Sequence, residues 1–598
     1  MPHRCLGIPE VLLIVAQELR TQSLPSVLSL ALTNSAICEP CLDVLWEEQT
    51  TLMPFLKLFP EYEMRVRPDR FPGVTSKPEE IHEVHLTGPP SRESWLKAQR
   101  YARRVRSMTF EKYDGGTYGR YQQRPSARGS TRTEENEEEE GEGEEDNNEN
   151  ENENENEDDA EEDGESDAGE PIVLRESVDI DQQSLKLLLQ CAEGEPLFPY
   201  LRSLDCTDPS SMQPSFFLDL PNLFVPSLRQ LLLALGQTDI EEDVTMIRAL
   251  PEACPDLTML LINCGGPLSE ETSEALREVI LQWGSLTVVR LPDTRASTLA
   301  HLGQCEAFET VDLAVREHIL LDGHPDPVAF GATVDWFAIE GHDPTFVEKA
   351  LKMISGARLK VKAFDVLFED DATPGAYDVR LRNLALLATM FEPSMVEQVL
   401  YYQDTAIDPT WGPLPPSSLV QFTAYPNLTH LGLDCWIDVT DADLATVAKG
   451  LPLLELFVLD VHAEEREDLE RQVRATLAGL IPFSHYCRKL ERLCLRMDAT
   501  EIPEIPETPE STPSIDHPIR THFADSEVEE PAAVAAFLAR IFPAGCTIAR
   551  YPPSHGIYSS YADTFDDDEC WNKERSGNWP IGLWSEVYDE LAELQEST

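Results

Sequence analysis

The sequence predicts an α/β protein in which a small helical unit precedes a long array of strand–helix repeats. Two observations support this prediction. Three short helical segments lie within the first fifty residues, and a six-residue apolar pattern recurs along much of the remaining 598-residue chain. A strand–helix repeat buries its apolar face only by stacking on its neighbours. We therefore expect parallel strands on a concave face and helices on a convex face.

The N-terminal unit is predicted from three segments that each begin at a proline. Pro9, Pro25 and Pro40 stand where helices would start, because the first helical position needs no N–H donor. The first helix is apolar nearly all round from Val11 to Ala16, whereas a helix resting on one core needs a single apolar stripe. It therefore has a second surface to bury, and a unit this small often completes itself on a partner.

The residues of this unit, 1–60, resemble an F-box. The resemblance rests on Ile8-Pro9-Glu10 at the start of the first helix, LPSVLSLAL in the second and LDVLW in the third. The family's usual Cys-Arg or Cys-Lys after the second helix is here Thr33-Asn34. The resemblance implies docking on the Skp-type linker subunit of a cullin–RING ubiquitin ligase. The implied docking residues are Ile8, Pro9, Leu12, Val15, Leu19, Leu42, Leu45 and Trp46. An ordinary helical hairpin that caps the next domain is the alternative.

The repeat pattern is apolar-x-x-apolar-x-apolar. After a first copy at Val105, copies begin at Leu201, Leu228, Leu257, Leu286, Phe308, Val334, Val361, Val396, Leu428, Leu454 and Leu490. From Leu201 onward they start 22 to 36 residues apart, mostly in or near the leucine-rich-repeat range. We expect a leucine-rich-repeat-like domain over residues 75–598, and another α/β or all-helical array is the alternative.

Amphipathic segments between these copies predict the helices of the array. They cover residues 184–192, 270–283, 344–354, 441–450 and 464–480, and a last helix covers 531–542. The aromatic residues near the C-terminus predict a cap over the exposed core of the last repeat, with an aromatic ligand pocket as the alternative. They are Trp571, Trp579, Trp584 and Tyr588.

An acidic tract interrupts the first repeat. Residues 134–170 hold 23 Asp and Glu and no Lys or Arg, so they cannot form a core. We expect a disordered insertion at about 114–175, which includes Glu134, Glu145, Glu157 and Glu170. The copies at Val105 and Leu201 then belong to adjacent strands, and the tract is a loop rather than a linker between domains.

A second low-complexity segment spans residues 501–518, EIPEIPETPESTPSIDHP. Its closely spaced prolines predict an extended loop. Thr508 and Thr512 precede prolines and are candidate phosphorylation sites, although such pairs also arise by chance in loops of this composition.

Charge, cysteine content and missing motifs argue against several classes of function. The formal net charge of −62 argues against nucleic acid as a partner, because phosphates would be repelled. Thirteen scattered cysteines and the lack of a secretory signal or membrane span predict an intracellular protein of the cytoplasm, the nucleus or both. Cys38-x-x-Cys41 is an isolated pair, and phosphate-loop, zincin and nucleophile-elbow motifs are missing. We therefore expect no enzyme, no cofactor and no metal.

An N-terminal F-box followed by a long leucine-rich array resembles the fungal F-box proteins of this layout. The resemblance implies a substrate adaptor in the ubiquitin-conjugation pathway, with the linker subunit and cullin complex at one end and an unknown protein client on the repeats. The alternative is an acidic leucine-rich binder of basic proteins such as histones, outside any ligase.

Overall fold

The structure is a computed structural model whose elements are described in defined ranges, in which the side chains of some residues, among them 9, 64–68, 80–84 and 177–180, are not described. The ranges are residues 8–68, 80–110, 177–180, 182–207, 219–236, 239–264, 268–305, 307–315, 328, 330, 333–341, 343–355, 358–368, 376–403, 413–433, 435–459, 473–505, 515–523, 526–548 and 583–596. The predicted acidic insertion, with Glu134, Glu145, Glu157 and Glu170, lies outside the described residues, as do Thr508 and Thr512.

The chain has an α/β fold built on one 15-stranded sheet whose neighbouring strands are all parallel. Strands follow one another in chain order. They are β1 (Glu48–Gln49), β4 (Ser107–Thr109), β6 (Ser203–Cys206), β7 (Gln230–Leu235), β8 (Met259–Cys264), β9 (Val288–Leu291), β10 (Thr310–Val315), β11 (Val334–Gly341), β12 (Val361–Phe368), β13 (Gln398–Gln403), β14 (His430–Leu433), β15 (Leu456–Leu459), β16 (Arg492–Leu495), β18 (Ile519–His522) and β20 (Cys546–Ile548).

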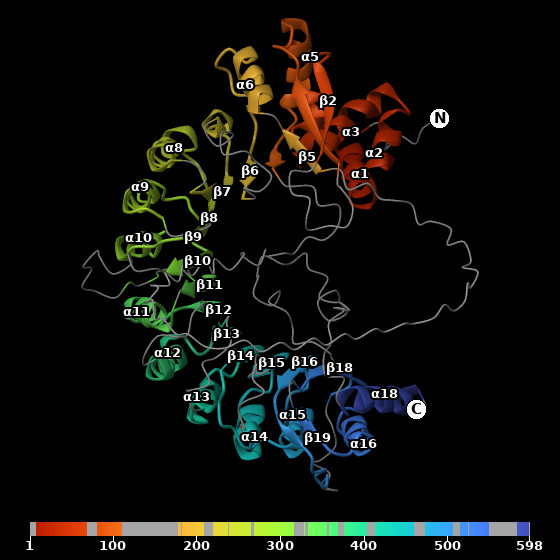
Figure 1. Cartoon of the computed structure of the whole chain (residues 1–598), viewed down its shortest axis with the longest axis vertical. Coiled ribbons are helices and arrows are strands. Elements are labelled where there is room, and N and C mark those ends of the chain that lie inside the picture. Colours follow the sequence, from red (N-terminus) through yellow and green to blue (C-terminus); the bar gives the residue numbers. More distant parts are fainter. Residues whose placement is uncertain are drawn as a thin grey trace, which may run out of the picture.

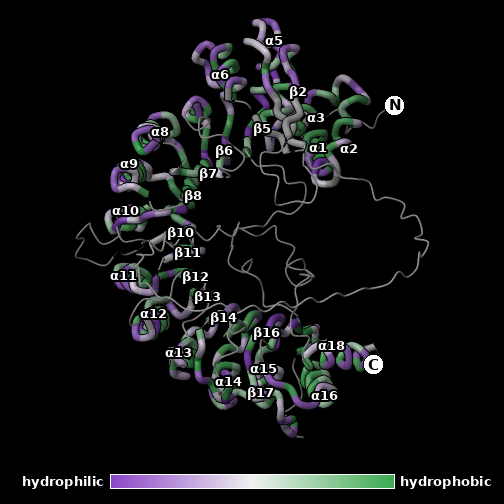
Figure 2. Tube along the Cα trace, in the orientation of Figure 1, coloured by the Kyte–Doolittle hydropathy of each residue, from purple (hydrophilic) through white to green (hydrophobic). Residues whose placement is uncertain are grey.

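Helices connect the strands and lie on the outer side of the curve that the sheet describes (Figure 1). They are α5 (Arg92–Ala102), α6 (Gln182–Cys191), α8 (Ile240–Ala253), α9 (Glu270–Ile280), α10 (Ala296–Leu302), α11 (Pro344–Ile354), α12 (Ala376–Met390), α13 (Ser417–Val420), α14 (Asp441–Gly450), α15 (Leu480–Tyr486) and α16 (Pro531–Ile541). Hydrophobic and hydrophilic residues alternate along α8 and α9, as expected for helices with one face on a sheet (Figure 2).

The predicted strand pattern is confirmed by the packing. The second and third apolar residues of each copy point toward the helices and align from strand to strand, as Leu231, Leu260 and Val289 do. These residues have no exposed surface and belong to one continuous core. Residues between them, such as Leu232 and Arg290, face the inner side of the curve, because side chains alternate along a strand.

The first repeat is assembled as the sequence predicts. β4 pairs with β6, with Met108 opposite Leu204, although 93 residues lie between the two strands, from 110 to 202. The sequence did not indicate a second sheet here, made of β2 (Tyr62–Pro68), β3 (Glu80–Leu86) and β5 (Ser177–Ile180) in that order. The N–H of Leu86 donates to Ser184 Oγ at 2.8 Å, which ties this sheet to α6.

One predicted helix is wrong. Of residues 464–480, the described part from Val473 to Ala475 is not helical, and Thr476 forms a strand-like bridge with Asp498. A short 3-10 helix (Leu477–Gly479) follows, and α15 begins only at Leu480. The cause is a tertiary contact, since the carboxylate of Asp441 accepts from both the N–H and the hydroxyl of Thr476, at 2.7 and 2.8 Å.

The N-terminal unit contains three helices: α1 (Pro9–Gln22), α2 (Leu24–Ala31) and α3 (Ser35–Glu47). The third begins earlier than predicted, and Pro40 lies inside it. Asn34 starts this helix because its side-chain oxygen accepts a hydrogen bond from the N–H of Ala36.

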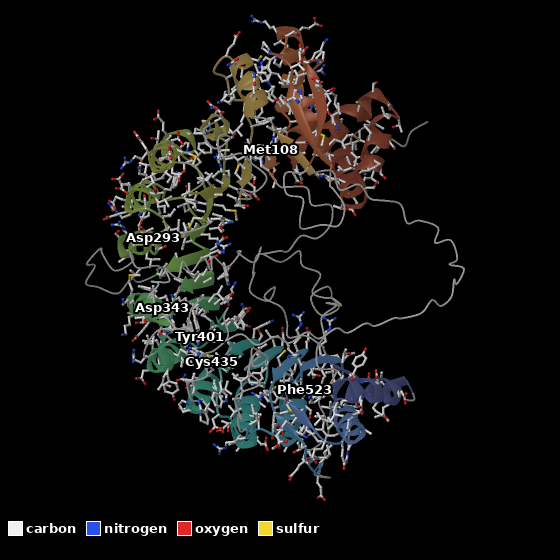
Figure 3. All side chains as sticks on the ribbon, in the orientation of Figure 1. Met108, Asp293, Asp343, Tyr401, Cys435 and Phe523 are labelled. Carbon is white, nitrogen blue, oxygen red and sulfur yellow. The ribbon has the colours of Figure 1, made fainter. Side chains whose placement is uncertain are left out.

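The C-terminal helix α18 (Leu583–Glu596) covers the last repeat. Trp584 stacks on Phe523 with ring centroids 4.7 Å apart and donates its indole N–H to the carbonyl of Ser526 at 2.7 Å. Val587 and Leu591 are buried in the main core. The prediction is thus confirmed for Trp584, whereas Tyr588 is exposed and Trp571 and Trp579 lie outside the described residues. Figure 3 labels Phe523 near this end of the array and Met108 near the opposite end.

Candidate docking surfaces

The three N-terminal helices enclose an apolar core that is separate from the core of the array. Its buried members are Leu12, Ala16, Val27, Ala31, Ile37, Cys41 and Val44, and Leu19, Leu30 and Leu45 pack against them. This core consists of small and medium side chains from all three helices. The unit thus has its own apolar interior, although a small one.

Beside this core, α1 and α2 leave large apolar side chains in solvent. Leu24, Leu28 and Leu32 are 52%, 51% and 79% exposed, and their four-residue spacing puts them on one face of α2 and its last turn. On α1, Ile14 is 64% exposed. Of the fifteen exposed large apolar side chains among the described residues, six lie here: Ile8, Leu13, Ile14, Leu24, Leu28 and Leu32. We call these six side chains the α1–α2 apolar surface.

The predicted docking residues of α1 only partly belong to this surface. Ile8 is exposed, and Val15 is half-buried. Leu12 is 3% exposed and lies in the core of the unit, where Leu19 also packs. We therefore correct the prediction for Leu12: this side chain holds the three helices together and has no free surface for a partner. Pro9 starts α1, and its side chain is outside the described ones.

The predicted docking residues of α3 are half-buried. Leu42 is half-buried and Leu45 packs against the core of the unit. Trp46 packs against the core of the array, with its ring centroid 4.8 Å from that of Tyr101 on α5. Trp46 therefore lies at the junction with the array, and as a half-buried side chain it stays a predicted partner contact. The leucines of α2 were not predicted as docking residues. The sequence contains a signal for them, because Leu24 and Leu28 lie on a different face of the helix from Val27 and Ala31.

The N-terminal unit joins the array without a free linker. β1 follows α3 directly and pairs with β4, and the N–H of Arg106 donates to the carbonyl of Glu47 at 2.7 Å. The largely buried guanidinium of Arg104 forms ion pairs with Glu39 and Asp43 of α3. These contacts fix the direction of α3 relative to the first strands.

The inner face of the sheet carries a charged network at its centre. Arg290 on β9 pairs with Asp312 on β10, 3.0 Å from Nε to Oδ2, and lies 3.8 Å from Glu340 on β11. On the next strand, β12, Asp365 accepts hydrogen bonds from the indole N–H of Trp336 at 2.6 Å and from the side-chain amide of Gln398 at 2.8 Å. Asp312 and Asp365 are both buried, and burial raises the pKa of each, that of Asp365 to about 6.

Beyond this network the inner face is apolar and closed. Leu400, Tyr402, Leu456, Val458 and Cys494 form a cluster apart from the main core, and none is more than 3% exposed. Gly432 lies among them. A larger residue would not fit at this position, because its Cβ would be 2.3 Å from the hydroxyl oxygen of Tyr402. The half-exposed part of the inner face is therefore on β6 to β9, where Asp205, Leu232, Met259 and Val288 lie.

Several of the described cysteines are buried thiols. Burial raises the pKa of Cys254, Cys487 and Cys546 to about 12, so these thiols stay protonated. Cys41 is buried in the N-terminal core and its pKa is raised by the same cause. Within the described ranges, no three His, Cys, Asp or Glu side chains come together as a metal site would require.

Comparison with known proteins adds no assignment. No known family's model matches the sequence, and a search of curated proteins finds no match. Among the helices described, none has the length and apolar character that crossing a membrane requires.

Proposed function

We propose that this chain is a substrate adaptor of a Skp–cullin–F-box ubiquitin ligase. In this proposal residues 1–60 are the F-box, and the array is a leucine-rich-repeat solenoid that holds a protein client. The adaptor does no bond chemistry. It brings lysines of the client close to the catalytic module of the ligase, in the cytoplasm, the nucleus or both.

The observation that carries the proposal is the α1–α2 apolar surface. A small unit with its own core gains nothing from exposing Leu24, Leu28 and Leu32 unless a partner covers them. The contacts of Arg104 and β1 support the proposal further, because they hold the unit in one orientation relative to the array. An adaptor benefits from such an arrangement, since the client then reaches the same place in each complex.

The test is co-purification of the full chain with the Skp-type linker and cullin. Leu28→Asp should weaken linker binding by about 1–3 kcal/mol, roughly 5- to 150-fold, because it puts a charge in the centre of the apolar surface. Ser29→Asp is the matched control, one residue further along the same helix and also exposed. Leu12→Ala should instead lower the stability of the unit, by about 2–5 kcal/mol for a buried leucine. If wild-type chain recovers neither linker nor cullin under non-denaturing conditions, the proposal is wrong.

The alternative, an acidic binder of basic proteins, has one structural observation in its favour. The centre of the inner face carries Asp312, Glu340 and Asp365 on three adjacent strands, of which Glu340 is the more exposed, and Arg290 on β9 pairs with Asp312 and Glu340. A basic protein would be attracted to this side and to the acidic composition as a whole. Histone binding that persists when Leu28→Asp abolishes linker binding would favour this second function.

A further inference from the structure

A small hollow lies across the carboxyl ends of β14, β15 and β16. It is a shallow depression open to solvent, with little enclosed space, and its lining residues are Trp436, Ile437, Asp438, Val439, Leu459, Val473, Arg474, Leu495 and Arg496. The carboxyl ends of parallel strands are where open α/β sheets commonly bind ligands. Figure 3 marks this part of the molecule by Cys435, which precedes Trp436.

The backbone around the hollow is held by contacts between segments that are distant in sequence. Leu414 binds both sides of Ile437, because its N–H donates to the carbonyl of Trp436 at 2.8 Å and its carbonyl accepts from the N–H of Asp438 at 3.0 Å. The N–H of Asp498 donates to the carbonyl of Ala475 at 2.8 Å. That bond aligns the segments of Arg474 and Arg496. The N–H of Met497 donates to Ser526 Oγ at 2.9 Å, which fixes the residue next to Arg496.

The two arginines differ in their partners. Arg474 pairs with Asp438, 2.9 Å from the guanidinium to Oδ2, and remains half-exposed. Arg496 is half-buried, its Nε is enclosed without a hydrogen-bond partner, and its guanidinium has no ion pair with a described carboxylate. A half-buried cation without a counter-ion is unfavourable. It is also unexpected in a chain where Asp and Glu outnumber Lys and Arg by 109 to 47.

We propose that this hollow binds a phosphate group, with Arg496 as the main anchor and Arg474 as the second. Arginine presents N–H donors in a planar fork that matches phosphate oxygens, and two such groups suit a dianion better than a single carboxylate. The apolar walls and the ring of Trp436 would then contact whatever carries the phosphate. The phosphate comes from one of two sources, free in solution or on a threonine such as Thr508 or Thr512 of this chain. This inference goes beyond the proposed function, because it concerns the array alone.

The experiment is isothermal titration of the full chain, without the linker subunit. One arm uses inorganic phosphate. A second uses a peptide of residues 503–515 phosphorylated at Thr508 and Thr512, and a third uses the same peptide without phosphate. We expect the phosphorylated peptide to bind and the unphosphorylated peptide to bind at least tenfold more weakly. Binding of inorganic phosphate alone would assign the site to the free anion.

Variants connect the binding to the hollow. Arg496→Gln should weaken phosphate binding at least tenfold, Arg474→Gln less, and Arg496→Lys should restore part of the loss. Lys489→Gln is the matched control, because it removes one positive charge at the opposite end of β16, where Lys489 pairs with Glu455 at 3.1 Å. Far-UV circular dichroism and thermal unfolding separate a loss of binding from a loss of fold. The proposal is overturned if wild-type chain binds neither phosphate nor phosphopeptide, if both peptides bind equally, or if Lys489→Gln and Arg496→Gln have equal effects. None of these results bears on linker binding.

Discussion

Asp365 is a carboxylate that the fold keeps almost out of contact with water. It lies on the inner face of β12, where burial raises its pKa to about 6 even though Gln398 and Trp336 donate hydrogen bonds to it. In the unfolded chain the same group titrates near its ordinary value of 3.8. The folded state therefore binds a proton more tightly than the unfolded state between these two pH values. Proton binding by Asp365 therefore adds to the stability of the folded state. This contribution is fully present below pH 3.8 and is lost as pH rises through 6.

The first prediction follows from that sign. Asp365→Asn should raise the free energy of unfolding relative to wild type at pH 8, where wild type buries an ionised carboxylate. An asparagine can still accept from Trp336, and Gln398 can turn its amide to match. The gain should be about 1–3 kcal/mol at pH 8 and should shrink toward pH 4, since about two units of pKa shift correspond to this range. Urea unfolding at the two pH values measures it, and a gain that grows toward pH 4 would contradict the assignment.

The sequence indicates the face on which Asp365 lies but not its partners. Asp365 stands between Phe364 and Val366, whose apolar character predicts the core side of the strand, so the alternation places Asp365 on the other side. Trp336 lies 29 residues away in the chain. The repeat aligns Phe337 with Phe364 and so places Trp336 and Asp365 on the same face of neighbouring strands. It does not indicate that these two side chains form a hydrogen bond.

At the scale of elements, the apolar repeat predicted the strands well and the helices less well. A strand needs two inward apolar residues at fixed positions, and this local requirement is visible in sequence. β18 was missed because Thr521 occupies a fully buried position where the pattern needs an apolar residue. Helix α12 was missed because Arg380 and Asn383, both buried, break its apolar stripe. Within the predicted helix 464–480, the described residues 473–479 are not α-helical, because the contact of Asp441 with Thr476 is not local.

The pairing of α11 with α12 gives an element-scale prediction. Glu348 on α11 accepts from Arg382 on α12 at 2.7 and 3.0 Å and also pairs with Lys352. The hydrogen bonds from Arg382, more than any other cause, lower the pKa of Glu348 to about 2. A lowered carboxylate pKa stabilises the fold above pH 4.5, and this stabilisation is lost as pH falls toward 2.

A double-mutant cycle with Glu348→Gln and Arg382→Gln measures that contact. We expect a coupling free energy of about 1 kcal/mol at pH 7, reduced because half of the Arg382 side chain is exposed to solvent. The coupling should fall at pH 3. Chemical denaturation of the four proteins provides the values, and a coupling that is the same at both pH values would show that the ion pair does not act through the charge of Glu348.

For the molecule as a whole, the acidic tract supplies the prediction that separates the two function classes. β4 and β6 are neighbours in the sheet, so the tract enters and leaves the array beside one repeat. Deleting residues 134–170 should leave thermal unfolding and linker binding nearly unchanged, because loop shortening changes closure entropy by about 0.6 kcal/mol per halving. Histone binding, if it occurs, should be weakened by the deletion and by salt, because exposed charges are screened beyond about 10 Å at 0.1 M. A large drop in unfolding temperature would contradict the assignment of the tract as a loop.

The candidate surfaces could be predicted only in part from the sequence. The sequence indicated a helical unit with two apolar sides, which is correct for α1, but it assigned Leu12 to the outside and missed the leucines of α2. Which apolar residue faces the core depends on how three helices pack, and periodicity within one helix leaves that choice open. The hollow at Arg496 was not indicated at all, because its lining comes from three segments that only the fold brings together.

The two ends of the 15-stranded sheet are its only unpaired edges among the described strands, and both are very short: two residues in β1 and three in β20. α3 leads directly into the first, and α18 packs on the second, with Gln595 donating to the carbonyl of Cys546 at 3.0 Å. Short, covered edges prevent strand addition from one molecule to the next. A chain ending at residue 548 would expose β20, and we expect it to form concentration-dependent polymers by light scattering while full-length chain stays dispersed. In this prediction α18 prevents self-association by covering the edge strand β20.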